Sequence, residues 1–389
     1  MPSKDNSKEQ ARKLLTSPSA WLEALEPPEV QSSDTWAEER VDLETWLYDS
    51  GYMNLKGIRL SETQMDALVA MDDINPKTNV KIEFVMEWGK GSGKDFISAL
   101  SGLRQCYSLQ CLKNPYDYYG LARNTGIQLV NVAYVKDQAN RVYLGQVKGL
   151  LKGSRWFTRR GFEVLKSTIR FPQEIEFISA AADGDAVEGN NMFFAVMDEA
   201  SAFRDTNVVR AMNKAEGQKV ERSADAIYRV LRTSTNSRFP GIGKVVIISY
   251  PRYIDDFTQV KRKENEKLTT GWTSGPLCTW DVNPRVTREQ FADDYARNPE
   301  LAMAMYECKP PYAEDGYVKN PDRYLRCVAN GGRIGLTSPL NEVGQFVQNF
   351  VGLPGRYYAI HIDLGLNKDK CGLALARQGE PVKDRKSVV

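Results

Sequence analysis

The chain has 389 residues, of which 42% are hydrophobic and 26% charged, with a formal net charge of +2 at pH 7. This length is enough for a substantial core and two or three domains, and the charge balance excludes attraction of nucleic acid by bulk charge. Six cysteines without a C-x-x-C pair and a single histidine, His361, disfavour a zinc site and fit reduced thiols in a cytosolic protein. No apolar run approaches the roughly 20 residues that a bilayer-spanning helix needs, so we expect no membrane association.

The first 60 residues are charged and contain scattered tryptophans and the breaker pair Pro27-Pro28. This pattern predicts short helices that pack on a larger domain and form an N-terminal arm, residues 1–60. The sequence Ser61-Glu62-Thr63-Gln64 then precedes apolar residues at helical spacing. It predicts a capped helix at the start of the next domain.

A glycine-rich segment follows the apolar run 82–86. A strand that turns into a helix through glycines exposes consecutive backbone N–H groups, which can bind a polyphosphate. The pattern G-x-x-x-x-G-K-[ST] is matched except that Trp88 replaces the first glycine and Asp95 replaces the hydroxyl residue that contacts magnesium. A carboxylate can also hold that metal, directly or through water. An ordinary glycine-rich turn is the alternative to a nucleotide site formed by Gly89, Lys90, Gly91, Ser92, Gly93, Lys94 and Asp95.

A second chemical signal is the apolar run 192–197, which ends in Asp198-Glu199. ATP hydrolysis needs one carboxylate to hold Mg²⁺ and another to orient and deprotonate the attacking water. We assign the first role to Asp198 and the second to Glu199. The alternative is an acidic helix cap after a strand.

Four apolar segments alternate with helical stretches, at residues 128–134, 174–178, 192–197 and 244–249. This alternation predicts an α/β fold with a mostly parallel sheet flanked by helices, and a nucleotide at the carboxyl ends of its strands. The last segment ends in Ser249-Tyr250-Pro251. A small hydroxyl residue there can sense the γ-phosphate, although a strand followed by proline is also common in loops.

The pattern weakens after Pro251, and we take residue 255 as the end of a core at 61–255. A charged region at 256–355 is predicted to be a lid or linker subdomain, with a short helix near 289–295. Residues 357–365 predict a strand that carries Asp363, and residues 371–376 predict its hairpin partner. Two basic runs, 152–160 and 261–263, fit a solvated surface as well as a nucleic-acid surface.

The loop Gly89–Lys94, the pair Asp198-Glu199, the element Ser249-Tyr250-Pro251 and the strand with Asp363 together resemble the large terminase subunits of tailed bacteriophages. The segment 131–139 also looks like a strand and helix start of that family. The resemblance covers roughly residues 61–371. In the family, an N-terminal P-loop ATPase pumps DNA into a procapsid, and a C-terminal nuclease with an RNase H-like fold cuts the concatemer.

The resemblance implies a role for each matching residue. Lys94 would contact the phosphates, with Lys90 at a loop position where many relatives have arginine, and Ser249 would couple hydrolysis to movement. Gln64 matches the glutamine that recognises adenine, although a solvent-facing glutamine is an equal alternative. The residue pair Val187-Glu188 stands where many relatives have an arginine before Gly189, which leaves the arginine finger unassigned, with Arg204 and Arg210 as candidates.

Asp363 matches the first metal-binding carboxylate of the nuclease, with Asp369 nearby. The remaining family carboxylates would lie beyond residue 389. The resemblance therefore implies that residues 356–389 are an incomplete start of an RNase H-like domain, as in a truncated product, a fragment or half of a split gene. We expect no nuclease activity from such a chain.

The resemblance implies an ATP-driven motor subunit that uses Mg²⁺, has an ASCE-type P-loop NTPase core and packages double-stranded viral DNA. Its expected partners are the portal protein, the small terminase subunit and further copies in a ring on the procapsid, in the bacterial host cytoplasm. One rival is a helicase-like DNA-dependent ATPase, for which residues 260–350 offer no second RecA-like domain. Another is a nucleotide-dependent DNA-binding or assembly module without turnover, which Asp95 and the unassigned finger make plausible.

Overall fold

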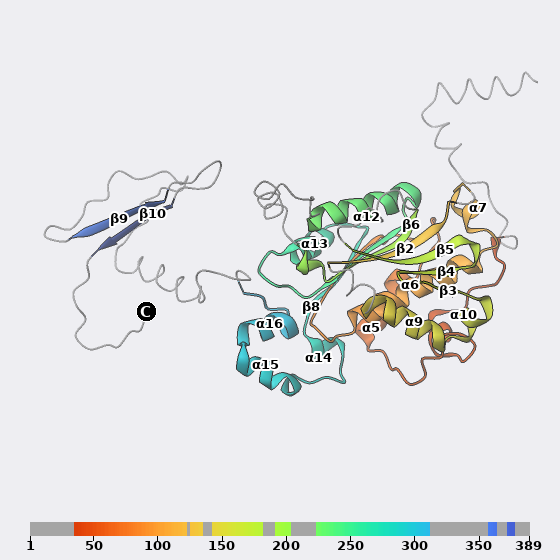
Figure 1. The fold of residues 1–389 in the computed structure, drawn as a ribbon, viewed down its shortest axis with the longest axis horizontal. Coiled ribbons are helices and arrows are strands. Elements are labelled where there is room, and N and C mark those ends of the chain that lie inside the picture. Colours follow the sequence, from red (N-terminus) through yellow and green to blue (C-terminus); the bar gives the residue numbers. More distant parts are fainter. Residues whose placement is uncertain are drawn as a thin grey trace, which may run out of the picture. The chain divides into compact units, whose positions relative to one another are not determined.

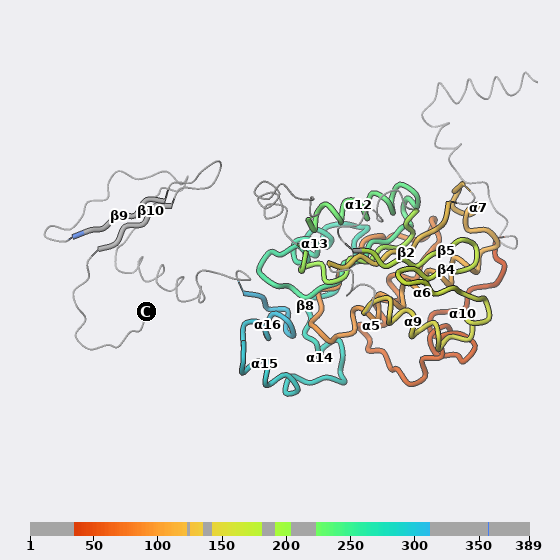
Figure 2. Tube along the Cα trace, in the orientation of Figure 1, coloured from red at the N-terminus to blue at the C-terminus, as the bar shows by residue number. Residues whose placement is uncertain are grey.

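The computed structural model describes residues 35–122, 125–134, 142–181, 191–203, 223–311, 357–363 and 372–377. The chain divides into two compact units, Met1–Gly316 and Tyr317–Val389. Figures 1 and 2 show the same chain as a ribbon and as a tube. Within the described residues, no helix is both long and apolar enough to cross a bilayer.

The described part of the first unit is built on an eight-stranded sheet of order β3-β4-β5-β2-β6-β7-β1-β8. The strands from β5 to β8 in this order are mutually parallel. Strand β4 is antiparallel to both of its neighbours, β3 and β5. The bounds are β1 Glu83–Trp88, β2 Ile127–Ala133, β3 Glu163–Val164, β4 Thr168–Phe171, β5 Ile175–Ala181, β6 Met192–Asp198, β7 Lys244–Ser249 and β8 Gly271–Leu277.

This sheet confirms the predicted α/β fold with a mostly parallel sheet. The strand β7 lies between β1, which leads into the glycine-rich loop, and β6, which ends in the acidic pair. An extra strand between these two is the ASCE arrangement expected from the sequence. The four apolar segments predicted as strands correspond to β2, β5, β6 and β7.

Helices cover both faces of the sheet (Figure 1). Along β1, Phe84 and Met86 point into one buried apolar cluster while Val85 points into the other, because side chains alternate along a strand. The first cluster includes side chains of α5 Glu62–Met71, α6 Lys94–Cys111, α9 Leu144–Gly153 and α10 Arg155–Arg160. The second includes side chains of α12 Ala224–Arg238, with α13 Phe257–Asn265 packed against it.

The described end of the predicted N-terminal arm is part of the core. Trp46 and Leu47 of helix α4, Leu43–Tyr48, are fully buried in the first cluster, and Trp36 forms a β-bridge with Leu112. Arg40 and Arg104 both form ion pairs with Asp72 at the end of α5. Residues 35–60 therefore pack as an integral layer on α6, and residues 1–34 lie outside the described part. The short helix α7, Pro115–Tyr119, follows α6.

The sheet continues past residue 255, where the sequence placed the end of the core. Strand β8 pairs in parallel with β1, although its residues Gly271 and Gly275 make it a poor strand candidate by composition. Gly275 has φ +116°, and a Cβ there would lie 2.2 Å from the Glu87 carbonyl oxygen. The close approach of β1 thus requires glycine at this position.

Helices follow β8 in the described region up to residue 311. The predicted helix near 289–295 appears as two pieces, η5 Arg288–Phe291 and α15 Ala292–Arg297. It is flanked by α14 Thr279–Val282 and α16 Pro299–Glu307. Among the described residues, two further 3₁₀ turns are η2 Pro172–Glu174 and η4 Ala200–Ala202.

The described part of the second unit is a β-hairpin. The antiparallel strands β9 Tyr358–Asp363 and β10 Gly372–Arg377 confirm the predicted strand pair, with Asp363 opposite Gly372. The predicted linkers at 330–332 and 353–355 and the residues Asp369, Arg204 and Arg210 lie outside the described residues. The division into four domains at 60, 255 and 355 stays a prediction.

Candidate functional site

Three neighbouring parallel strands bring the predicted site residues to one edge of the sheet. Ile248 near the end of β7 pairs with Asp198 at the end of β6, and Ser249 pairs with Glu87 near the end of β1. Because the strands run the same way, the segments that follow β1, β6 and β7 emerge side by side. The glycine-rich loop, the acidic pair and Ser249 therefore lie together.

The loop between β1 and α6 depends on glycine. Gly91 and Gly93 have φ values of +87° and +89°, which side chains other than glycine rarely adopt. A Cβ on Gly89 would lie 2.4 Å from Thr279 Oγ1. Trp88, which replaces the first glycine of the motif, is fully buried and donates from Nε1 to Ser274 Oγ. The substitution therefore fills the core beside β8 and leaves the loop itself intact.

The N-terminus of α6 has the character of an anion site. Gly93 is its N-cap residue, and no described side chain caps it. The helix is 18 residues long, so its first N–H groups and its dipole present positive partial charge to the loop. These N–H groups are the donors that a phosphate would use.

Lys94 supplies a full positive charge at this point. Its side chain is almost entirely buried, with Nζ 3.4 Å from Glu199 Oε1 and 5.6 Å from the centroid of the Tyr250 ring. Burial alone would lower the pKa of Lys94, but the nearby carboxylates of Glu199, Asp95 and Asp198 outweigh it and raise that pKa. Lys94 therefore remains an ammonium ion.

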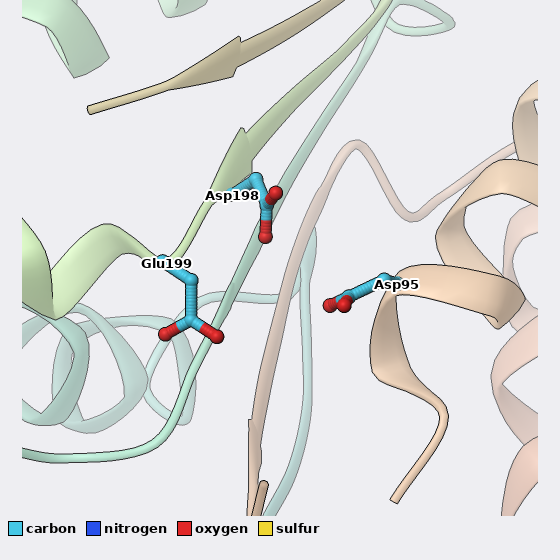
Figure 3. Close-up of side chains that lie close together, drawn as sticks. All are labelled: Asp95, Asp198 and Glu199. Atoms are coloured by element: carbon cyan, nitrogen blue, oxygen red, sulfur yellow. The ribbon is translucent and has the colours of Figure 1, made fainter. Parts of the chain in front are cut away.

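Three carboxylates face one another at the strand end (Figure 3). Oxygen atoms of Asp95, Asp198 and Glu199 all lie within 4.8 Å of one another. Oδ1 of Asp95, Oδ1 of Asp198 and Oε2 of Glu199 are buried and have no hydrogen-bond partner among the described residues. Such a set of converging oxygen ligands fits a hard divalent cation such as Mg²⁺.

The electrostatics of this cluster reflect crowded negative charge. Burial, reinforced by Asp95 and Glu199, raises the pKa of Asp198 well above its ordinary value. Burial also raises the pKa of Asp95, although Lys94 opposes the shift. A cation bound among the carboxylates would relieve this cost.

Glu199 has an unusual backbone. Its φ and ψ are both +50°, a left-handed conformation that a glutamate adopts only when its surroundings impose it. It is the N-cap residue of the turn η4, and its side chain is 19% exposed. The conformation turns the chain sharply after β6 and leaves the side chain partly exposed, with Oε1 beside Lys94 and Oε2 buried.

Ser249 connects the ends of two strands. Its Oγ accepts from the Ser201 N–H at 3.2 Å and donates to the Tyr250 carbonyl at 3.0 Å. Ser201 lies two residues after Glu199, and its own hydroxyl is 2.7 Å from Thr258 Oγ1 in α13. These bonds link β7, the segment after Glu199 and α13. The coupling role of Ser249 stays a prediction, for which this chain of contacts offers a route.

Gln64 is buried and not solvent-facing. Its Nε2 donates to the Ser92 carbonyl at 2.8 Å, and its Oε1 accepts from the Ser61 N–H at 3.1 Å in a capping box. Recognition of adenine by Gln64 stays a prediction, and it would require at least one of these bonds to be exchanged. The side chain of Lys90 is exposed, as a phosphate-contacting cation at the rim of the loop would be.

The two basic runs differ in how far their charges are neutralised. In the run 261–263, every cation forms an ion pair: Lys261 with Glu264, Arg262 with Glu87 and Glu266, and Lys263 with Asp255. In the run 152–160, Trp156 and Phe157 are buried and Arg160 pairs with Glu38, while Lys152, Arg155 and Arg159 are exposed. The run 152–160 thus anchors the fold through Trp156 and Phe157 and still presents three exposed cations, so a nucleic-acid surface there stays a prediction.

Sequence reasoning missed two residues that touch the loop. Thr279 and Asn283 lie at the start and just after the end of α14, and donate to the carbonyls of Lys90 and Gly91. They are about 190 positions from the loop, so no local pattern reveals the contact. Their signal is structural: β8 is the neighbour of β1, and α14 begins directly beyond it.

Most of the chain matches a known protein family. Residues 9–308 match the family model described as the N-terminal P-loop domain of the uncharacterised protein MJ0330. The chain belongs to this family. The loop between β1 and α6 is accordingly its P-loop. The protein MJ0330 of Methanocaldococcus jannaschii is 26% identical over 238 residues, 57% of this chain and 39% of that protein. The chain thus spans about two fifths of the length of this curated relative.

Solved structures of phage large terminases show weaker likeness. The Thermus phage P74-26 large terminase ATPase domain is 18% identical over 66% of this chain and 96% of that chain, with a TM-score of 0.40. The HK97 bacteriophage large terminase is 15% identical over 83% and 61% of the two chains, with a TM-score of 0.35. A large terminase from a thermophilic bacteriophage, in complex with ATP-gamma-S, is 13% identical over 61% and 49%, with a TM-score of 0.36. Because these scores lie below 0.5, the fold assignment rests on the family match and the sheet topology.

Proposed function

We propose that this chain is an ATP-hydrolysing motor subunit. The observation that carries the proposal is the meeting of Lys94, Asp198 and Glu199 beside the P-loop at the carboxyl edge of the sheet. Lys94 Nζ and Glu199 Oε1 are 3.4 Å apart, and the three carboxylates of the cluster lie within 4.8 Å. ATP hydrolysis needs these groups in one place: a cation for the outer phosphates, carboxylates for a metal and a base for water.

Each residue has a role that follows from its position. Lys94 exchanges its contact with Glu199 for the outer phosphates when ATP binds, and this exchange frees the Glu199 carboxylate to orient the attacking water. Asp198 and Asp95 would hold Mg²⁺, which when bound would neutralise charge on the phosphates. The ion pair of Lys94 with Glu199 thus keeps the base occupied until nucleotide arrives.

More specifically, we propose that the motor is a large terminase subunit that packages double-stranded viral DNA. It is supported by the order of the sequence elements that resemble this family, from the P-loop through Asp198-Glu199 to Ser249 and Asp363. Its partners would be double-stranded DNA, a portal protein, a small terminase subunit and further copies of the chain in a ring. The ring would dock on a procapsid in the bacterial host cytoplasm.

Phosphate release tests the proposal. The protein is incubated with ATP and Mg²⁺, alone, with double-stranded DNA and with single-stranded DNA, and Lys94→Ala serves as the inactive control. Release stimulated by duplex DNA supports the motor. Stimulation by single strands only would favour the helicase-like alternative, and ATP binding without release would favour the assembly module. Release that ignores DNA would leave a P-loop ATPase and overturn the packaging role.

A further inference from the structure

The backbone of the P-loop is braced by side chains from outside it. Three consecutive carbonyl groups of the loop each accept a hydrogen bond from a different side chain. The pairs are Thr279 Oγ1 to the carbonyl of Lys90 (2.9 Å), Asn283 Nδ2 to that of Gly91 (3.1 Å) and Gln64 Nε2 to that of Ser92 (2.8 Å). The carbonyl before them, that of Gly89, accepts from the Ser92 N–H at 3.2 Å. Every carbonyl from Gly89 to Ser92 therefore has a defined direction.

The direction of a carbonyl fixes that of the next N–H, because a trans peptide is planar and its C=O and N–H point in opposite senses. The bond from Thr279 therefore fixes the N–H of Gly91, and the bond from Gln64 fixes the N–H of Gly93. These are the two glycines with positive φ at the turn into α6. The bond from Asn283 holds the turn between them. Thr279 and Gln64 thus set two N–H groups that would face a phosphate, and Asn283 orients the Ser92 N–H, which donates to the Gly89 carbonyl.

The donors are themselves held in place. Thr279 is fully buried, and its hydroxyl also lies 3.3 Å from the Tyr306 carbonyl. The carbonyl of Val282 in α14 accepts from Ser61 Oγ at 2.7 Å, which joins α14 to the N-terminus of α5, the helix that carries Gln64. The Lys90 N–H donates to the Met305 carbonyl at 2.7 Å. The loop therefore lies against a frame made of α5, α14 and the end of α16.

We propose that Gln64, Thr279 and Asn283 are positioning residues that shape the P-loop for polyphosphate binding. Gln64 acts through the Ser92 carbonyl and does not select the base. This inference rests on the proposed nucleotide site but not on hydrolysis or on DNA. Loss of a bond that shapes the loop should weaken the binding of every ligand that carries a polyphosphate. Loss of a contact with the base should weaken the binding of adenine nucleotides alone.

The test measures binding of ATP, GTP and inorganic tripolyphosphate by calorimetry. Gln64→Met, Thr279→Val and Asn283→Leu each remove one donor while keeping similar volume. Because each leaves one loop carbonyl without its partner, we expect all three ligands to bind about tenfold more weakly, with the ratio of ATP to GTP affinity unchanged. Thr279→Ser keeps the hydroxyl and should bind like the wild type.

The matched control is Thr158→Val in α10, which removes a threonine hydroxyl bonded to the Ser154 carbonyl far along the chain from the loop. It should leave ligand binding unchanged. Melting temperatures identify any variant that fails to fold, and Asn283→Leu, whose site is half-buried, keeps the test open if Thr279→Val is unfolded.

Loss of ATP binding alone in Gln64→Met would show that Gln64 contacts adenine and would overturn the inference for that residue. Unchanged binding in all three variants would overturn it entirely, as would a wild type that binds no polyphosphate. A wild type that binds polyphosphates without hydrolysing ATP would overturn the proposed function and leave the positioning role standing.

Discussion

The two halves of the candidate site are prepared in opposite ways. In the P-loop, every carbonyl from Gly89 to Ser92 already has a hydrogen-bond partner within the protein. In the acidic cluster, Asp95, Asp198 and Glu199 each keep a buried oxygen without a partner among the described residues. The P-loop carbonyls thus have their hydrogen-bond partners, whereas each carboxylate of the acidic cluster has one oxygen without a partner among the described residues.

The difference shows where energy is stored. A loop with satisfied carbonyls can hold its shape without a ligand and costs little to maintain. Buried carboxylates that face one another are costly until a cation joins them, as the raised pKa of Asp198 indicates. We therefore expect changes in the loop to alter ligand binding, and changes in the cluster to alter chemistry and metal dependence.

The largest effect is expected from Glu199→Gln, which removes the base and keeps the shape. ATP hydrolysis should fall by about 10²–10⁴-fold, the usual contribution of general base catalysis, while ATP binding is retained. Single-turnover phosphate release and ATP affinity measure the two quantities. Turnover within a few fold of the wild type would remove Glu199 from the chemistry and break the proposed division between the two halves.

Gly89→Ala tests the P-loop and its contact with the residues that surround it. The new Cβ would meet Thr279 Oγ1 at 2.4 Å and the Tyr306 carbonyl oxygen at 2.6 Å, so the loop must move away from its frame. We expect a loss of about 1–3 kcal/mol in the free energy of unfolding and weaker nucleotide binding. Gly149→Ala in α9, with nothing within 4 Å of its Cβ, is the control and should stabilise by about 0.5–1 kcal/mol. Equal behaviour of the two variants would contradict the close approach.

Asp198→Asn tests the acidic cluster through the pH dependence of the unfolding free energy. The pKa of Asp198 is raised in the folded state above its ordinary value of 3.8, so its contribution to stability is fully present below 3.8 and is lost as the pH rises through the folded pKa. Without divalent cations, the unfolding free energy of the wild type should therefore fall with rising pH, and Asn should reduce this fall by on the order of 1 kcal/mol.

Denaturant unfolding at about pH 5.5 and 7.5, with and without Mg²⁺, measures this effect. Magnesium should stabilise the wild type more than Asp198→Asn, because a ligand stabilises the state that binds it. The exposed residue Asp293 in α15 supplies the control variant, Asp293→Asn. Parallel pH curves for the wild type and Asp198→Asn would show that the cluster stores no such energy.

The smallest effect is expected at Asp95, where the family pattern has a hydroxyl. Asp95→Thr should keep activity, since a hydroxyl is the usual ligand, whereas Asp95→Ala should raise the Mg²⁺ concentration for half-maximal hydrolysis by a few fold. A magnesium titration of the ATPase rate measures this. If Asp95→Ala titrates like the wild type, Asp95 serves the N-terminus of α6 and not the metal.

Local chemistry makes much of the fold predictable. Alternating apolar runs locate four strands of the sheet, and the capping box at Ser61 locates α5. The strand β8 escapes prediction because Gly271 and Gly275 dilute its β pattern, and only the approach of β1 explains why glycine is needed there. The sequence predicts that an arm of short helices packs on a larger domain, but it does not show that Trp46 contacts Tyr107 and Arg104 of α6.

The site divides along the same line. Residues adjacent in the sequence, such as Asp198 and Glu199, are visible as motifs because strand ends deliver them together. Thr279 and Asn283 are not, because their position depends on the sheet order that places β8 beside β1. The sequence shows that Gln64 belongs to a capping pattern, but it does not show that its amide donates to the Ser92 carbonyl.

The position of β7 sets the dimensions of the site. Adjacent strands lie about 4.8 Å apart, so the interposed strand separates the ends of β1 and β6 by roughly 9.6 Å. Side chains bridge this separation, because Lys94 Nζ lies 3.4 Å from Glu199 Oε1 and one oxygen of Asp95 lies within 4.8 Å of oxygens of Asp198 and Glu199. Direct pairing of β1 with β6 would halve the separation of the two strand ends and bring the start of the P-loop next to the acidic pair. The order of the strands thus determines how far apart the P-loop and the acidic pair leave the sheet.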